Sequence, residues 1–323
     1  MTTAGPTSRD ATSDDRLAFA AAGEICRRHS PGLYFCSMFL PRYKRDAAFA
    51  VVAFCRMIVD AIDQPSSQDW SGGCSGDSLT GRIAMLGDKL NEIYDQRLEL
   101  PNAEFRSPDQ HVLHAIALTI HRCQIPREHF LDLAEGCRLR QTVSRYATWN
   151  SLEKYLHLVG GAVSRMLCCV VGVTHSDAGE QIATLGVAIQ LTTILRDLKA
   201  DCERGRIYLP LEDLARFRYS EKDLAAATVN EQFRELMHFE IDRARQLYRQ
   251  GVQGICWLGG DGSRIAASAI AVLQSAILKA IKRQDYDVFR NSARPGLLQQ
   301  LACLPRAWRL ARCEAGELLP KLL

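Results

Sequence analysis

The sequence predicts an all-α protein with a single domain, and three observations support this fold class. Apolar residues recur at three- and four-residue spacing along most of the 323 residues, which is the period of amphipathic helices, and no alternating strand stands out. No repeat, low-complexity tract or shift of composition marks a domain boundary. An apolar content of 47% and a charged content of 24% are typical of a globular protein with a large core. We expect a disordered N-terminal tail over residues 1–15 and one helical domain over residues 16–323.

The expected helices follow from this periodicity in chain order. The first spans residues 17–29 and ends before Pro31 and Gly32. The second spans residues 41–62 and stops before Pro65, which opens a Ser/Gly-rich loop that extends to Gly81. Further helices are expected over residues 82–98, 108–122, 126–140, 149–172, 178–202, 229–254, 262–284 and 295–315.

Charge and cysteine usage exclude several functional classes. A net charge of +3 without a basic block does not indicate nucleic-acid binding. The twelve cysteines are scattered without a CxxC pair, so a reduced protein with buried thiols is favoured over a disulfide framework or a zinc site. The first fifteen residues are polar, and no run of eighteen apolar residues predicts a transmembrane segment. We expect a cytoplasmic protein, with loose membrane-surface association and the oligomeric state left open.

The strongest functional signal lies between Gly186 and Asp213. Asp197 and Asp201 are four residues apart, so they share one face of the expected helix with Thr193 and Gln190. Two stacked carboxylates repel each other unless a cation lies against them, and Mg²⁺ prefers oxygen ligands of this kind. The alternative interpretation is a solvated acidic helix face.

A pair of arginines follows the acidic turn. Arg204 and Arg206 flank Gly205, and their planar side chains can offer forked donors to phosphate oxygens. Carboxylates that suit Mg²⁺, followed at once by arginines that suit phosphate, indicate a site for a metal-bound diphosphate.

Residues 190–210, QLTTILRDLKADCERGRIYLP, resemble the second aspartate-rich motif of the squalene/phytoene synthase family, approximately Q-L-x-N-I-L-R-D-x-x-x-D…R-G-R-x-Y-L-P. Thr193 stands where the family has a metal-binding asparagine. The resemblance implies that Asp197 and Asp201 hold Mg²⁺, with the Thr193 hydroxyl as a weaker ligand. It also implies a catalytic role for Arg196 and substrate contacts by Gln190, Arg206 and Tyr208.

Residues 54–63, FCRMIVDAID, resemble the first aspartate-rich motif of the same family, F-C-R-x-x-D-D-x-x-D. Two of its three aspartates are kept, as Asp60 and Asp63, while Val59 replaces the first and cannot ligate a metal. The resemblance implies that Asp60 and Asp63 hold Mg²⁺ opposite the second motif and that Arg56 takes part in catalysis. The alternative is a helix-end salt bridge between Arg56 and Asp60.

Three further segments carry the resemblance. His29 and Ser30 match family positions that hold a diphosphate, although an ordinary helix cap and loop is the alternative. Residues 130–161 resemble a segment that ends in Y-x-x-x-V-A-G, which implies that Tyr155 lies beside the carbocation and stabilises it. Residues 286–289 read Y-D-V-F, as in the family.

The resemblance extends over roughly residues 25 to 310 and implies an isoprenoid-synthase-type helical bundle around a central cavity. It implies a prenyltransferase that condenses two allylic diphosphates of the farnesyl or geranylgeranyl type head-to-head, with Mg²⁺, and with NADPH only if the product is reduced. The departures from the family pattern cluster where metal and diphosphate are held, at Val59, Thr193, Arg140 and Asn291. A half-reaction enzyme that handles presqualene diphosphate, or a non-catalytic scaffold, is therefore the alternative.

Overall fold

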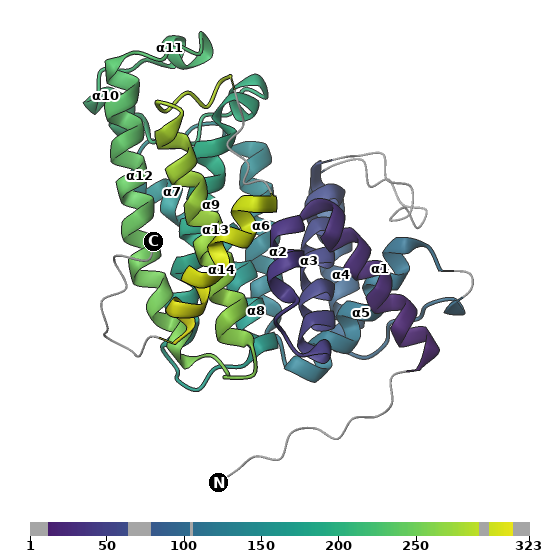
Figure 1. Cartoon of the computed structure of the whole chain (residues 1–323). Helices are drawn as coiled ribbons and strands as arrows, with labels where there is room; N and C mark the ends of the chain where they lie inside the picture. The colour runs from purple at the N-terminus through teal and green to yellow at the C-terminus, as the bar shows by residue number, and fades with distance from the viewer. Residues whose placement is uncertain (1–11, 64–78, 104–105, 291–296, 313–323) are drawn as a thin grey trace.

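The computed structural model describes residues 12–63, 79–103, 106–290 and 297–312, and Figure 1 shows that they form a bundle of helices. Over these ranges there is no strand, only the isolated bridges Arg145–Ile207 and Val173–Leu258, so the predicted all-α class is confirmed. The helices of the first half are α1 (Ser13–His29), α2 (Pro31–Ser37), α3 (Arg42–Asp63), α4 (Leu79–Tyr94), α5 (Pro108–Cys123), α6 (Arg127–Thr142), α7 (Trp149–Leu156), the π-helix η3 (His157–Gly161) and α8 (Ala162–Val171). Those of the second half are α9 (Ala178–Glu203), α10 (Leu211–Arg216), α11 (Glu221–Ala225), α12 (Glu231–Gly251), the 3₁₀-helix η4 (Val252–Trp257), α13 (Ser263–Arg283) and α14 (Leu297–Ala311).

The first helix begins earlier than predicted. Thr12 accepts a hydrogen bond from the backbone N–H of Asp15, and the Asp15 carboxylate accepts one from the N–H of Thr12, which forms a capping box. Residues 13–15 therefore belong to α1 and not to the predicted tail. The signal was present in the sequence, since a threonine precedes an acidic residue by three positions at the start of the apolar period.

Other boundaries also differ from the prediction. The helix expected over residues 149–172 is α7 and α8 joined by a π-turn, and the one expected over 229–254 ends at Gly251 and continues as a 3₁₀-helix. The short helices α2, α10 and α11 were not predicted, because five to seven residues hold too few apolar positions to show a period. Helix α4 begins at Leu79, inside the predicted loop, while residues 64–78 of that loop lie outside the described ranges.

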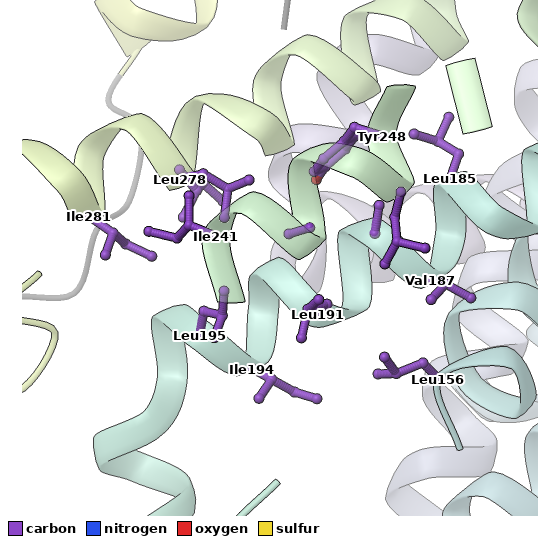
Figure 2. Close-up of a cluster of buried hydrophobic side chains, with 14 of the residues drawn as sticks. Leu156, Leu185, Val187, Leu191, Ile194, Leu195, Ile241, Tyr248, Leu278 and Ile281 are labelled. Carbon is purple, nitrogen blue, oxygen red and sulfur yellow. The ribbon is translucent and has the colours of Figure 1, made fainter. Parts of the chain in front are cut away.

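The buried side chains form two clusters. The N-terminal core, which includes Phe54, Ile58 and Phe130, is built mainly from α1, α3, α4, α5, α6 and α8. The C-terminal core is built mainly from α7 and α9 to α14, and Figure 2 shows part of it, with Leu191 and Leu195 of α9 below α12 and α13. Figure 1 shows the two halves side by side, purple and blue for the first and green to yellow for the second.

Helix α9 is the central element of the bundle, since it packs against α7, α8, α12, α13 and both short helical turns η3 and η4. Its contact with η3 is made through glycines. A Cβ added at Gly186 would lie 2.2 Å from the backbone oxygen of Gly160, and one added at Gly160 would lie 2.3 Å from that of Gly186. No side chain fits between these backbones, so the glycine pair sets the distance between the π-turn and α9.

The cysteines and the apolar helices agree with a packed bundle. The described ranges hold ten free cysteines, most of them buried, and burial raises the pKa of thiols such as Cys26 and Cys36 to about 12.

Two helical stretches, Trp149–Val171 and Ser263–Arg283, are long and apolar enough to cross a membrane by length and composition alone. Core helices of a bundle pass the same test, and 56% of the second window is buried inside the protein, so this is weak evidence for a membrane span.

The glycine contact gives the first prediction. Gly186→Ala should lower the free energy of unfolding by about 1–3 kcal/mol or more, because the added methyl group would overlap the Gly160 backbone. Gly179→Ala is the matched control on the same helix, since a Cβ there meets no atom within 4 Å and should leave stability unchanged or slightly higher. Urea denaturation followed by circular dichroism measures both, and equal stability of the two variants would contradict the role given to this contact.

Candidate active site

The predicted second acidic motif lies at a kink of α9. Asp197 has non-helical backbone angles (φ −101°, ψ 15°) within the helix, and Arg196 Nε donates to its Oδ1 at 2.8 Å. Burial and, after it, the nearby Asp197 carboxylate raise the pKa of the Asp201 carboxyl to about 6, against the opposing charges of Arg204, Arg206 and Arg140. The two carboxylates therefore interact across one turn, as the spacing predicts.

The chain turns directly after the kink. Gly205 has a φ of +74°, a conformation that a glycine adopts without strain, and the backbone N–H of Arg206 bonds to the carbonyl of Asp201 at 2.9 Å. From there the segment runs beside residues 144–147, with bonds from the N–H of Ile207 to Ser144 and from Leu211 to Tyr146, both at 2.9 Å. This pairing brings Tyr208 next to the helix that carries the predicted catalytic tyrosine.

Three buried tyrosines form an aromatic cluster, and one of them, Tyr208, lies near Asp201 of the acidic turn. The ring centroids of Tyr155 and Tyr208 are 5.5 Å apart, and Tyr146 lies 5.4 Å from the first and 5.9 Å from the second. Burial raises the pKa of all three hydroxyls, and a hydrogen bond donated by the Tyr155 hydroxyl to that of Tyr208 reinforces the effect at Tyr155. These groups stay neutral at ordinary pH, so the cluster is an electron-rich surface without a formal charge.

Two members of this site were not among the predicted site residues. Tyr146 belongs to the cluster, and its hydroxyl has no hydrogen-bond partner within the described residues. Arg140 lies close enough for its positive charge to lower the pKa of Asp201, Tyr155 and Tyr208. The sequence signal for Arg140 was its departure from the family pattern, and Tyr146 lies within residues 130–161, the segment that carries the resemblance around Tyr155.

The first acidic motif forms an ion pair on α3. Arg56 donates to both carboxylate oxygens of Asp60, with Nε–Oδ2 at 2.9 Å, so the alternative interpretation of this motif, a helix-end salt bridge, is confirmed. Val59, which replaces the first family aspartate, packs at the edge of the N-terminal core. The side chain of Asp63 lies outside the described residues, so its role as a metal ligand stays a prediction.

The remaining predicted residues are accessible to different degrees. His29 is exposed at the end of α1, and the Ser30 side chain makes no capping bond to α2, which contradicts the alternative of an ordinary serine cap. Gln190 is half-buried, and the half-buried Thr193 donates its hydroxyl to the carbonyl of Ile189 at 3.1 Å. The Thr193 oxygen keeps its lone pairs for a further contact.

The carboxylates of the second motif fit a divalent cation. The Asp197 carboxylate raises the pKa of Asp201, and this repulsion would be relieved by a cation placed between the two side chains. Within the described residues no three His, Cys, Asp or Glu side chains meet closely enough to hold a metal by themselves. The C-terminal ends of α3 and α9 both lie toward the upper end of Figure 1, and the convergence of their aspartates on a shared site stays a prediction.

The predicted central cavity also stays a prediction. An open cavity of about 660 Å³ lies near α4 and α5 and is lined by Arg106, His114 and His121 among others. None of the predicted site residues lines it.

A buried ion cluster anchors the elements that carry Tyr155 and Tyr208. Arg243 of α12 donates to Asp213 of α10 at 2.8 Å and to Glu240 at 2.7 Å, and its guanidinium lies 4.4 Å from the ring centroid of Trp149, the first residue of α7. Glu240 is fully buried, and this burial together with the neighbouring Asp213 carboxylate raises its pKa to about 7 against the opposing charge of Arg243. One arginine therefore ties α7, α10 and α12 together.

Solved structures share this architecture. The chain superposes on a dehydrosqualene synthase in complex with a ligand with a TM-score of 0.80 and 26% identity, covering 93% of this chain and 98% of that one. It also superposes on the squalene synthase HpnC from Alicyclobacillus acidocaldarius with a TM-score of 0.73 and 25% identity, covering 85% and 97%. The fold is thus the all-helical fold of the isoprenoid synthases, as predicted.

Sequence comparisons identify the family to which this chain belongs among the isoprenoid synthases. Residues 26–301 match the squalene/phytoene synthase family. The 15-cis-phytoene synthase of Synechococcus elongatus is 32% identical over 302 residues, covering 90% of this chain and 92% of its own, and the phytoene synthase of Arthrospira platensis is 33% identical over 307 residues, covering 90% and 93%. The chain belongs to the squalene/phytoene synthase family. The prediction of a prenyl-group transferase is confirmed, and the half-reaction and scaffold alternatives are not favoured.

The Glu240 cluster gives a prediction for pH. Because the pKa of Glu240 is raised from 4.5 to about 7, the folded state keeps a proton that the unfolded state releases, so this stability is present at low pH and is lost as pH rises through about 7. We expect Glu240→Gln to flatten the pH dependence of the unfolding free energy by about 1–3 kcal/mol between pH 5 and pH 8. Denaturant titrations at several pH values measure it.

The control for this prediction is Glu235→Gln, an exposed position on the same helix. It should keep the pH slope of the wild-type protein. Identical slopes for wild type and both variants would contradict the assignment of the raised pKa to Glu240.

Proposed function

We propose that this protein condenses two molecules of geranylgeranyl diphosphate head-to-head to a phytoene-type C40 hydrocarbon, with loss of two diphosphates and two protons. Curated relatives at 32–33% identity over nine tenths of the chain are named phytoene synthases, which supports the longer substrate. The observation that carries the proposal is the acidic, arginine-flanked turn of Asp201 beside the buried cluster of Tyr155 and Tyr208.

The two parts of the site suit the two demands of the reaction. A diphosphate leaves readily only where positive charge is concentrated, and Arg204, Arg206 and Arg140 lie around the turn of Asp201. In our proposal Asp197 and Asp201, with Asp60 and Asp63, hold Mg²⁺, which supplies further positive charge to the departing diphosphate. Thr193 stands where the family has asparagine, and its hydroxyl offers a weaker oxygen.

The allylic cation left behind needs a dry surface that stabilises charge without reacting. The rings of Tyr146, Tyr155 and Tyr208 are each at most 5% exposed and present π faces, which attract cations. A hydroxyl oxygen in this cluster can also accept the proton that ends the reaction. Termination by proton loss needs no reductant, so we expect NADPH to be dispensable.

The test is incubation of the purified protein with Mg²⁺ and either farnesyl or geranylgeranyl diphosphate, with and without NADPH. We expect a C40 product from geranylgeranyl diphosphate in the absence of NADPH, identified by mass spectrometry of the organic phase. Asp201→Asn should lower the rate by about 10²-fold or more, because it removes a charged oxygen at the diphosphate site.

Glu203→Gln is the matched control, since Glu203 lies two residues further along and is exposed. It should retain nearly full activity. A C30 product would overturn the substrate assignment alone, whereas no turnover with either substrate, together with no Mg²⁺-dependent ligand binding, would overturn the proposed function.

A further inference from the structure

Two of the aspartates proposed as Mg²⁺ ligands are each held by an arginine of the same helix. On α3 the Arg56 guanidinium donates to both carboxylate oxygens of Asp60, with Nε–Oδ2 at 2.9 Å. On α9 the Arg196 guanidinium donates in the same forked manner to Asp197, with Nε–Oδ1 at 2.8 Å and Nη2–Oδ2 at 2.5 Å. Both acidic motifs therefore share one arrangement, in which an arginine occupies the carboxylate oxygens that a metal would use.

The pair on α9 coincides with the kink of that helix. Adjacent side chains of a regular α-helix point in directions about 100° apart and do not face each other. Asp197 departs from helical angles, and its carboxylate meets the guanidinium of the residue before it. The backbone distortion and the ion pair thus occur together, in the middle of the second acidic motif.

Both pairs can be reached from solvent. The side chains of Arg56 and Asp60 are 39% and 36% exposed, and those of Arg196 and Asp197 are 20% and 30% exposed. Ion pairs with this exposure stabilise a fold little, since water competes for both partners. Either arginine can therefore leave its carboxylate while the helix that carries it stays folded.

The side chain of Asp201 has no arginine bound in this way. Its ion-pair partner within the described residues is Arg204, whose Nη1 lies 4.0 Å from Oδ1, too far for a hydrogen bond. Asp201 therefore offers open carboxylate oxygens one turn beyond Asp197. A cation bound there would lie beside the Arg196–Asp197 pair.

We infer that Arg56 and Arg196 couple the binding of Mg²⁺ to the binding of the diphosphate. Each arginine leaves its aspartate when the carboxylate oxygens are taken by Mg²⁺, because the two cations compete for the same oxygens and repel each other. The released guanidinium then binds phosphate oxygens, which suit its forked donors. Each ligand thereby favours the other, since a bound diphosphate keeps the arginine away from the carboxylate. The inference rests on the proposed function, from which it takes Asp60 and Asp197 as Mg²⁺ ligands.

The test measures the two ligands separately, with Mn²⁺ as a spectroscopic probe for Mg²⁺ and geranylgeranyl thiodiphosphate as an unreactive substrate analogue. Electron paramagnetic resonance gives the affinity for Mn²⁺ in the absence of any diphosphate. We expect Arg56→Gln and Arg196→Gln each to bind Mn²⁺ about threefold more tightly than the wild type, because the competing cation is removed. Calorimetry at saturating Mg²⁺ should show about tenfold weaker binding of the thiodiphosphate, because the fork that holds it is lost.

Arg138→Gln is the matched control. Arg138 holds Glu135 with the same fork on α6, at 2.7 and 2.6 Å, and belongs to neither acidic motif. Both of its affinities should equal those of the wild type, and circular dichroism should show that all three variants are folded.

The inference and the proposed reaction can fail independently. An unchanged or weaker affinity for Mn²⁺ in both Arg56→Gln and Arg196→Gln, or undiminished binding of the thiodiphosphate, would overturn the inference even if the wild type makes a C40 product. The two expected shifts, found in a protein that makes no product, would support the inference and overturn the reaction alone.

Discussion

The contact between the backbones of Gly160 and Gly186 is the constraint on which the rest of the site depends. It holds the π-turn against α9 with no side chain between them. Tyr155 lies two residues before the π-turn, and the kink at Asp197 follows Gly186 by about three turns of the same helix. Because helices are stiff over such lengths, the spacing between the aromatic cluster and the acidic turn follows from this contact.

The proposed site contains charged groups whose burial costs folding free energy. Two carboxylates sit near each other in a partly buried position, and a buried arginine-carboxylate cluster holds the neighbouring helices. Groups whose pKa is shifted in this way are typical of functional sites, because a ligand of the opposite charge then gains most from binding. Arg140 fits this view. Its positive charge lowers the pKa of Asp201 and so compensates part of the repulsion between the two carboxylates.

The sequence was sufficient for the fold class, the central helix and the shared face of Asp197 and Asp201, since these depend on local periodicity. It was also sufficient for the Arg56–Asp60 pair, which follows from four-residue spacing on one helix. It could not show the π-turn, because the reason for it is a tertiary contact with Gly186. The family pattern marked Arg140 as a departure near the diphosphate, but local spacing could not show that Arg140 lies near Asp201 or Tyr146 near Tyr208, since these contacts join segments about sixty residues apart.

The division of the interior into two cores has a consequence for motion. The partly buried Phe39, Val159 and Val171 are the side chains that pack against both cores within the described residues. Helix α8, whose buried side chains belong mainly to the N-terminal core, packs along α9 of the C-terminal core. The two halves are therefore joined by a helix–helix contact, and they should move as one body and not open independently along their boundary.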